Sequence, residues 1–137
     1  MQNEIIVRFC IWGFDDVDHK FISAALTIDP TQVYIKGERK NPKFAALANK
    51  NGWLVDATTN RNEPFDTQLE RLLQILGSKR EIVQEFSSKY SCEISCAIFM
   101  YFDNGENTPS IHLSPEQIKT MSDLGVEFDI DLYCLPN

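Results

Sequence analysis

The sequence has few of the residues and motifs from which metal and phosphate sites are built. Its 137 residues contain only two histidines, His19 and His112, and no CxxC or CxxH pair. No GxxxxGKS, GxxxxGKT or GxGxxG loop occurs, and no serine lies in a GxSxG elbow. The pattern therefore argues against a zinc site, a glycine-rich nucleotide loop and a serine hydrolase of the common type. We expect no metal and no cofactor.

Long apolar runs are also missing. No stretch approaches the roughly 20 residues of a membrane helix, and Glu4 and Arg8 interrupt the segment where a signal peptide would have its apolar region. We therefore expect a cytoplasmic protein without a membrane partner. The cysteines are Cys10, Cys92, Cys96 and Cys134. All lie in apolar segments with a strand-like pattern, which is typical of small buried hydrophobes in a reducing compartment.

Charge is distributed unevenly along the chain. There are 13 Lys and Arg against 20 Asp and Glu, a net charge of −7. Up to Trp53 the chain has seven basic and six acidic residues, whereas the remainder has six basic and 14 acidic residues. Such a surface repels the phosphate backbone, although residues 36–50 form a small basic segment. The balance argues against nucleic acid and favours a basic protein as partner.

Side-chain periodicity predicts the elements. Period-two alternation predicts strands over residues 4–12, 92–102 and 126–133, with shorter strands over 32–35, 53–55 and 110–113. In the last strand, Val126, Phe128, Ile130 and Leu132 are expected to face the core. Helical spacing predicts helices over 17–26, 65–76, 79–90 and 115–124, and a single helical turn over 44–48. The interleaved elements indicate one α+β domain over residues 1–137.

The expected architecture is a mostly antiparallel sheet of five to six strands, with three to four helices packed on one face and two loosely similar strand-helix-strand halves. Local signals place the helix starts. Asp15 and Asp16 are candidate caps of the first helix. Capping boxes are expected at Ser78-Lys79-Arg80-Glu81 and at Ser114-Pro115-Glu116-Gln117. Ile118, Met121 and Leu124 are then expected to face the core.

Several short motifs follow one another in a familiar order. They are Leu26-Thr27-Ile28-Asp29-Pro30-Thr31, Lys36-Gly37-Glu38, Trp53, His112-Leu113-Ser114 and Phe128-Asp129-Ile130-Asp131-Leu132-Tyr133. Over nearly the whole chain, this order resembles a family of small bacterial proteins known as domain of unknown function 4279. A glycine usually follows the leucine of the first helix in that family, whereas Thr27 stands here. The resemblance implies a bacterial α+β single domain and supplies no catalytic residues.

The first candidate site is a row of carboxylates. Glu127, Asp129 and Asp131 alternate along the last strand and therefore share one face, about 6.5–7 Å apart. Such a row can bind a basic partner, a divalent cation or, as an acid and base pair, a substrate. It can equally be the solvated face of a strand whose other side is core.

The second candidate site is the tripeptide Lys36-Gly37-Glu38 together with Trp53. A glycine permits a tight turn, the flanking charges can contact a ligand, and an indole can stack on a ring or a cation. The alternative interpretation is an ordinary turn, with Trp53 as an aromatic of the core.

Three functions follow from these observations. The first is a non-enzymatic protein-binding domain of the immunity or inhibitor type, which uses its acidic surface against a basic partner such as a toxin. The second is a small-molecule-binding domain, or an enzyme of unrecognised type, with a pocket near Lys36, Glu38 and Trp53. The third is a structural module that forms a homodimer through an exposed sheet edge or an apolar patch.

Overall fold

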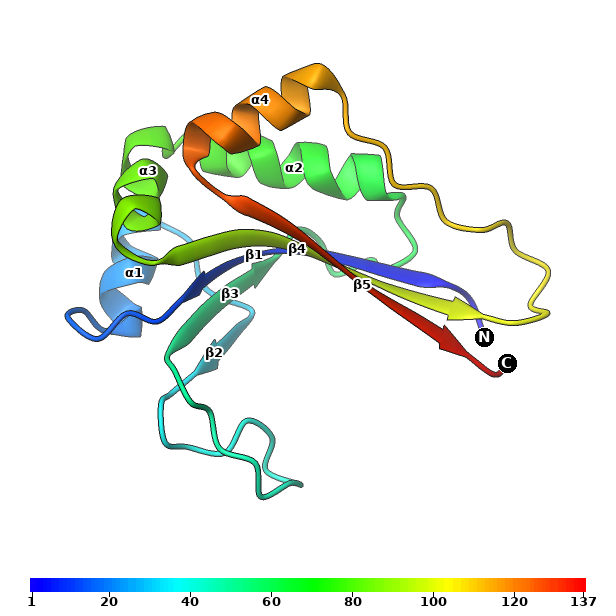
Figure 1. The fold of residues 1–137 in the computed structure, drawn as a ribbon, viewed down its shortest axis with the longest axis horizontal. Coiled ribbons are helices and arrows are strands. Elements are labelled where there is room, and N and C mark those ends of the chain that lie inside the picture. The colour runs from blue at the N-terminus through cyan, green and yellow to red at the C-terminus, as the bar shows by residue number, and fades with distance from the viewer.

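A five-stranded mixed sheet, in the order β2-β3-β1-β4-β5, forms the centre of the molecule (Figure 1). The computed structural model describes residues 1–137. The strands are β1 (Glu4–Trp12), β2 (Gln32–Tyr34), β3 (Gly52–Asp56), β4 (Ser91–Tyr101) and β5 (Glu127–Leu135). Neighbouring strands are antiparallel except β4 and β5, which are parallel. The expected α+β architecture with a mostly antiparallel sheet is confirmed.

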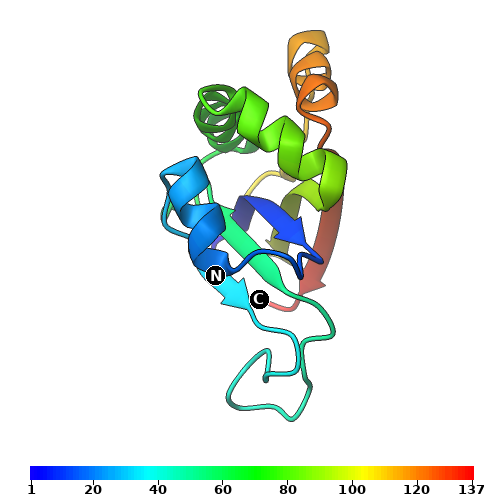
Figure 2. The ribbon, with the colours of Figure 1, turned by 90° about the vertical axis from the view of Figure 1, so that its left-hand side faces the viewer.

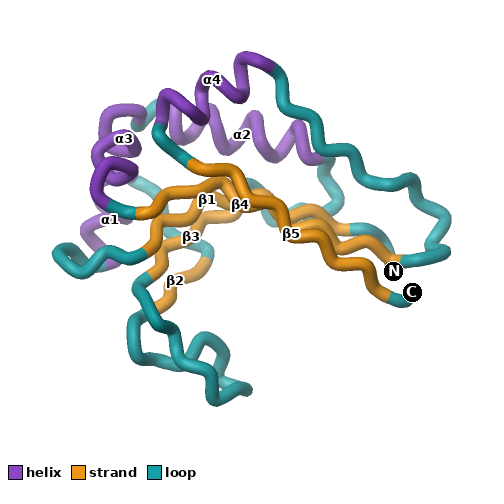
Figure 3. Tube along the Cα trace, viewed as in Figure 1, coloured by secondary structure: helices purple, strands orange, loops and turns teal.

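Four helices cover one face of this sheet (Figures 2 and 3). They are α1 (His19–Leu26), α2 (Phe65–Gly77), α3 (Arg80–Lys89) and α4 (Pro115–Leu124). The core lies between the two layers. Its 22 residues include alternate side chains of β1 and β4 together with the apolar stripes of the helices. The 35–51 segment that joins β2 to β3 projects on the opposite side of the sheet, away from α2 and α4.

A glutamine side chain completes the pairing of β1. Because β3 pairs only with the second half of β1, the backbone groups of Ile5 and Val7 on that side lack a strand partner. Gln68, which is 1% exposed in α2, accepts a bond from the Val7 N–H at 3.1 Å and donates to the Ile5 carbonyl at 2.8 Å. Its amide therefore takes the place of a peptide unit, as buried backbone groups require.

The segment from 103 to 114 corrects one expectation, because residues 110–113 form no strand. A strand there would need a free edge of β4, but β1 and β5 occupy both sides of β4. The expected helical turn over 44–48 is also absent. Arg39 and Leu47 form an isolated bridge there instead, so the 35–51 loop continues the β2–β3 hairpin irregularly.

The helix starts differ in part from those expected. Asp18, not Asp15 or Asp16, caps α1 and accepts a bond from the Phe21 N–H at 2.8 Å. The Ser78 capping box does not form, because α2 runs on to Gly77 and the Ser78 hydroxyl donates back to the α2 carbonyl of Ile75.

The start of α4 is as expected in its cap but not in one of its side chains. The Ser114–Gln117 capping box is confirmed, with Pro115 at the first turn. Ile118 was expected to face the core, yet it is 53% exposed, because it lies on the outer side of α4, whereas Met121 and Leu124 are buried.

Both chain ends lie at the same end of the sheet (Figure 1). The Met1 ammonium donates to the side-chain oxygen of Asn137.

At the C-terminal end of α1, Thr27 adopts a left-handed conformation with φ +57°. No helix combines the length and the hydropathy that a transmembrane span requires.

Candidate functional site

The face of the sheet that no helix covers carries the polar side chains of every strand. On β1 this face presents Ile6, Arg8, Cys10 and Trp12, and β5 contributes Glu127, Asp129 and Asp131 through the register with β4. Ile6 and Cys10 are nonetheless buried, because the side chains of the neighbouring strands surround them. The open face is therefore a packed surface with polar edges, and its two edges differ in charge.

At the centre of the open face, Arg8 and Asp56 form an ion pair across β1 and β3. The Arg8 Nε and the Asp56 carboxylate are 3.0 Å apart, in directly paired positions of the two strands. Both side chains are mostly shielded from solvent, with exposed fractions of 23% and 13%. The pair neutralises itself, so the charge available to a partner lies elsewhere on this face.

One edge of the open face is the expected carboxylate row. Glu127, Asp129 and Asp131 are all exposed on β5, the last strand of the sheet. Glu93 on β4 lies opposite Glu127 and adds a fourth carboxylate, whose oxygen accepts a bond from the Trp12 indole N–H at 3.1 Å. The five ion pairs of the structure involve none of these four residues. The row therefore has no cation to neutralise it.

The helix-facing side of β5 corrects another expectation. Phe128 packs against the core and makes an edge contact with Phe65, but Ile130 and Leu132 are 47% and 58% exposed. The helices α2 and α4 lie over the first part of β5 only, so its second half has no cover (Figure 1). On the open face, Tyr133 stacks on Phe99 with ring centroids 4.9 Å apart and remains 46% exposed.

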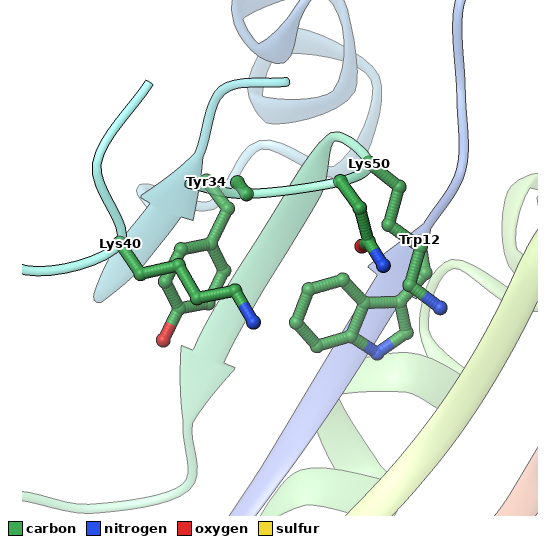
Figure 4. A pocket seen from close by; sticks show the side chains of 6 residues that line it. Trp12, Tyr34, Lys40 and Lys50 are labelled. Carbon is green, nitrogen blue, oxygen red and sulfur yellow. The ribbon is translucent and has the colours of Figure 1, made fainter. Parts of the chain in front are cut away.

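At the opposite edge, Trp12 and Tyr34 form the wall of a cavity of about 180 Å³ (Figure 4). Their rings lie within 17° of parallel, with centroids 5.6 Å apart. The remaining lining residues are Lys40, Ala48, Asn49 and Lys50, all from the 35–51 loop. The Lys50 ammonium lies 5.3 Å from the centre of the Trp12 ring, within the range of a cation–π contact.

Gly52 makes this aromatic wall possible. It lies on β3 between Trp12 and Tyr34 in the sheet register. A Cβ atom at this position would come within 2.4 Å of the Trp12 ring and 3.2 Å of the Tyr34 ring. Only a glycine therefore lets the two rings approach each other across the intervening strand.

The turn at Lys36-Gly37-Glu38 and Trp53 do not come together in one pocket. Gly37 has φ +86°, as a turn glycine does, and both flanking charged residues are exposed. Trp53 is fully buried on the helix side of β3, where its indole N–H donates to the Ser23 hydroxyl at 3.0 Å. The expected pocket around Trp53 is therefore wrong, because the alternation of β3 turns this indole into the core.

The sequence pattern led us to expect Trp53 in a pocket, whereas Trp12 is the tryptophan that lines the cavity. The signal was present, because the alternation of β1 puts Trp12 on the same face as Arg8 rather than with the core residues. This pattern does not show how β1 pairs with β3 and β3 with β2, and that pairing brings Gly52 and Tyr34 beside Trp12.

Comparison with known protein families identifies the family of this chain. The model of the domain of unknown function DUF4279 matches residues 3–135. The chain belongs to the DUF4279 family. No curated protein and no solved structure matches the chain.

The three buried cysteines of this DUF4279 domain, Cys10, Cys92 and Cys96, are not activated nucleophiles. Burial raises the pKa of Cys10 and Cys96 to about 12 and that of Cys92 to about 11. A thiol with such a pKa is protonated at neutral pH and is a poor nucleophile. Cys134 is the exposed one. The structure has no group of three His, Cys, Asp or Glu side chains placed to hold a metal ion.

Proposed function

We propose that this DUF4279 protein is a non-enzymatic binding domain of the inhibitor or immunity type, which binds a basic protein partner along β5. The observation that supports this most directly is the state of β5 itself. It is a nine-residue edge strand with three exposed carboxylates on one face and exposed Ile130 and Leu132 on the other. Natural proteins usually protect edges of this length.

The backbone of β5 offers the first part of the interaction. Only β4 pairs with it, so the N–H and C=O groups of its outer edge are free to bond an added strand. Proteins that recognise an extended segment in this way gain affinity from main-chain bonds and specificity from alternate side chains. Ile130 and Leu132 supply apolar contacts on one face of such an added strand.

The carboxylates select the partner. Glu127, Asp129 and Asp131 have no cation of their own, so lysines or arginines on an added strand would neutralise them. Opposite charges in cross-strand positions stabilise a sheet, and like charges oppose it. A second copy of this chain also carries a net charge of −7, which disfavours pairing through the same strand. A basic segment therefore fits this edge better than a homodimer.

A synthetic strand tests this proposal. The probe is a peptide of alternating lysine and valine, about eight residues long, which is the length of an ordinary strand. We expect it to shift the amide NMR signals of β5, to slow hydrogen exchange at the outer edge, and to bind more weakly as salt rises from about 0.05 to 0.5 M. A glutamate–valine peptide should not bind.

Two controls separate strand addition from general attraction to an acidic protein. E127Q/D129N/D131N should abolish binding, whereas D15N/D29N/E81Q removes the same charge from exposed positions elsewhere and should leave it nearly unchanged. A lysine–valine peptide N-methylated at alternate residues keeps its charge but cannot form the ladder. Equal binding by the methylated peptide, or a dimer of the free protein in light scattering that blocks the probe, would overturn the proposal.

A further inference from the structure

We propose that the cavity bordered by Trp12, Tyr34, Lys40 and Lys50 is a binding site for a small planar ring that carries a carboxylate. The cavity lies at the β2 side of the open face. The strand β4 separates it from β5, which is the strand proposed to bind a protein. The inference therefore does not rest on the proposed function. It stands on the size, the walls and the charge of the cavity.

The size of the cavity sets the size of the ligand. A volume of about 180 Å³ is slightly larger than the roughly 150 Å³ of an apolar cavity that holds benzene. It is smaller than the roughly 300 Å³ at which sites for drug-sized molecules begin. One six-membered ring with a single substituent therefore fits, whereas a whole nucleotide exceeds the space.

The walls favour a flat molecule. Trp12 and Tyr34 are nearly parallel, and both rings pack over the bare backbone of Gly52. Aromatic rings prefer offset stacking or edge contacts with other rings. Each ring's polar group already has one partner, since the Trp12 indole N–H donates to Glu93 and the Tyr34 hydroxyl accepts from Gln32. The aromatic side of the cavity therefore offers mainly apolar surface to a ligand.

The charge of the cavity favours an anion. Lys40 and Lys50 both line it, and no carboxylate pairs with either ammonium group. In Figure 4 the Lys40 side chain extends over the space between the two rings. Asn49 adds a side-chain amide. Two cations and an amide donor opposite an apolar wall match a molecule with a ring at one end and a carboxylate at the other.

The loop that carries the lysines is held in place. The Gly37 N–H donates to the Ala48 carbonyl at 2.9 Å, and the Ala48 N–H donates to the Glu38 carbonyl at 2.8 Å. At its base, the Asn51 side chain donates to the Phe14 carbonyl at 2.7 Å and accepts from the Lys36 N–H at 2.9 Å. The cavity walls are therefore largely formed before a ligand arrives, which lowers the entropic cost of binding.

The two tryptophans provide the measurement. The indole N–H signals of Trp12 and Trp53 can be assigned with W12F, and Trp53 is fully buried away from the cavity. In a titration with benzoate we expect a saturable shift of the Trp12 signal and none of the Trp53 signal. Benzamide, which keeps the ring without the charge, and cyclohexanecarboxylate, which keeps the charge without the flat ring, should bind at least about tenfold more weakly.

Lysine variants test whether Lys40 and Lys50 bind the carboxylate of the ligand. K40Q and K50Q should each weaken benzoate binding by about threefold to tenfold, as expected for a partly exposed ionic hydrogen bond. K43Q removes an exposed lysine of the same loop that does not line the cavity, and it should leave binding unchanged. No saturable Trp12 shift, equal binding of benzamide and benzoate, or an equal effect of K43Q would each overturn the proposal.

Discussion

The guanidinium of Arg80 donates two hydrogen bonds to the carboxylate of Asp123, from Nε to Oδ2 at 2.6 Å and from Nη2 to Oδ1 at 3.0 Å. The pair joins α3 to α4 on the outer surface of the helical layer. The same bonds lower the pKa of Asp123 and raise that of Arg80. A planar guanidinium matches a carboxylate in this two-point geometry, which lysine cannot reproduce.

Asp123 is therefore expected to contribute stability that depends on pH. Because its pKa is lower in the folded than in the unfolded chain, the contribution is present above the ordinary aspartate pKa and is lost as the pH falls through the lowered value. D123N should lower the melting temperature slightly at pH 7 and less at about pH 3. R80Q/D123N should be no less stable than D123N at pH 7, and an additive loss would show that the two residues do not interact.

Gln68 should be among the most sensitive polar positions. Q68L keeps the size of the side chain but leaves the buried Val7 N–H and Ile5 carbonyl without these partners. Each unpaired group costs about 1–3 kcal/mol, so we expect a loss of about 2–4 kcal/mol in urea unfolding. Q74L changes an exposed glutamine of the same helix and should stay within about 0.5 kcal/mol. A similar small effect for Q68L would contradict the role assigned to its amide.

Gly52 should not tolerate even a methyl group. G52A places a Cβ within 2.4 Å of the Trp12 ring, so Trp12 must move away from Tyr34. We expect a loss of about 1–3 kcal/mol from overpacking and a shift of the Trp12 indole signal. G77A is the matched control, because nothing lies within 4 Å of its new Cβ at the end of α2. It should be neutral or stabilising by up to about 1 kcal/mol.

Thr27 is expected to be improved by glycine. A β-branched residue at φ +57° is strained by roughly 1–2 kcal/mol, whereas glycine adopts this conformation freely at some entropic cost. T27G should therefore raise the free energy of unfolding by roughly 0.5–1 kcal/mol. T120G, made in the interior of α4, should lower it by roughly 0.3–0.5 kcal/mol. If T27G destabilises the domain, the bond from Lys79 to the Thr27 hydroxyl outweighs the strain.

The thiols should fall into two classes. In the native protein at pH 8, iodoacetamide should modify only Cys134, and in urea it should modify the three buried cysteines as well. C134S should remove the native adduct. Since the buried thiols have raised pKa values, their protonated state favours the fold below pH 9, and stability should fall as the pH rises from about 9 toward 11 or 12. Rapid native labelling at three or four sites would contradict this burial.

The fold could be predicted where the spacing of apolar residues along an element indicates which of its faces is buried. The alternation over residues 4–12 and the capping box at Ser114 each specify an element from neighbouring residues alone. The strand expected over 110–113 failed because strand formation needs a free edge, and only the complete sheet shows that β4 has none. The expected burial of Ile130 and Leu132 was wrong for a similar reason, because it depends on how far α2 and α4 extend over β5.

The candidate site shows the same division. The common face of Glu127, Asp129 and Asp131 follows from period-two alternation and is found in the structure. Which tryptophan is accessible depends on which face of the sheet the helices cover, and a shift of one residue exchanges the two faces. Trp53 and Trp12 both lie next to a glycine in the sequence, but only the pairing of three strands places Trp12 beside Tyr34.

The shared position of the chain ends has a mechanical consequence. The beginning of β1 and the end of β5 lie at one end of the sheet, on either side of β4 (Figure 1). A force that separates the two ends therefore acts across the strands and opens the ladders one hydrogen bond after another. Domains pulled along their strands must break many such bonds at once. A low pulling force on both chain ends should accordingly open this sheet, beginning at the end of the β4–β5 ladder that lies nearest the chain ends.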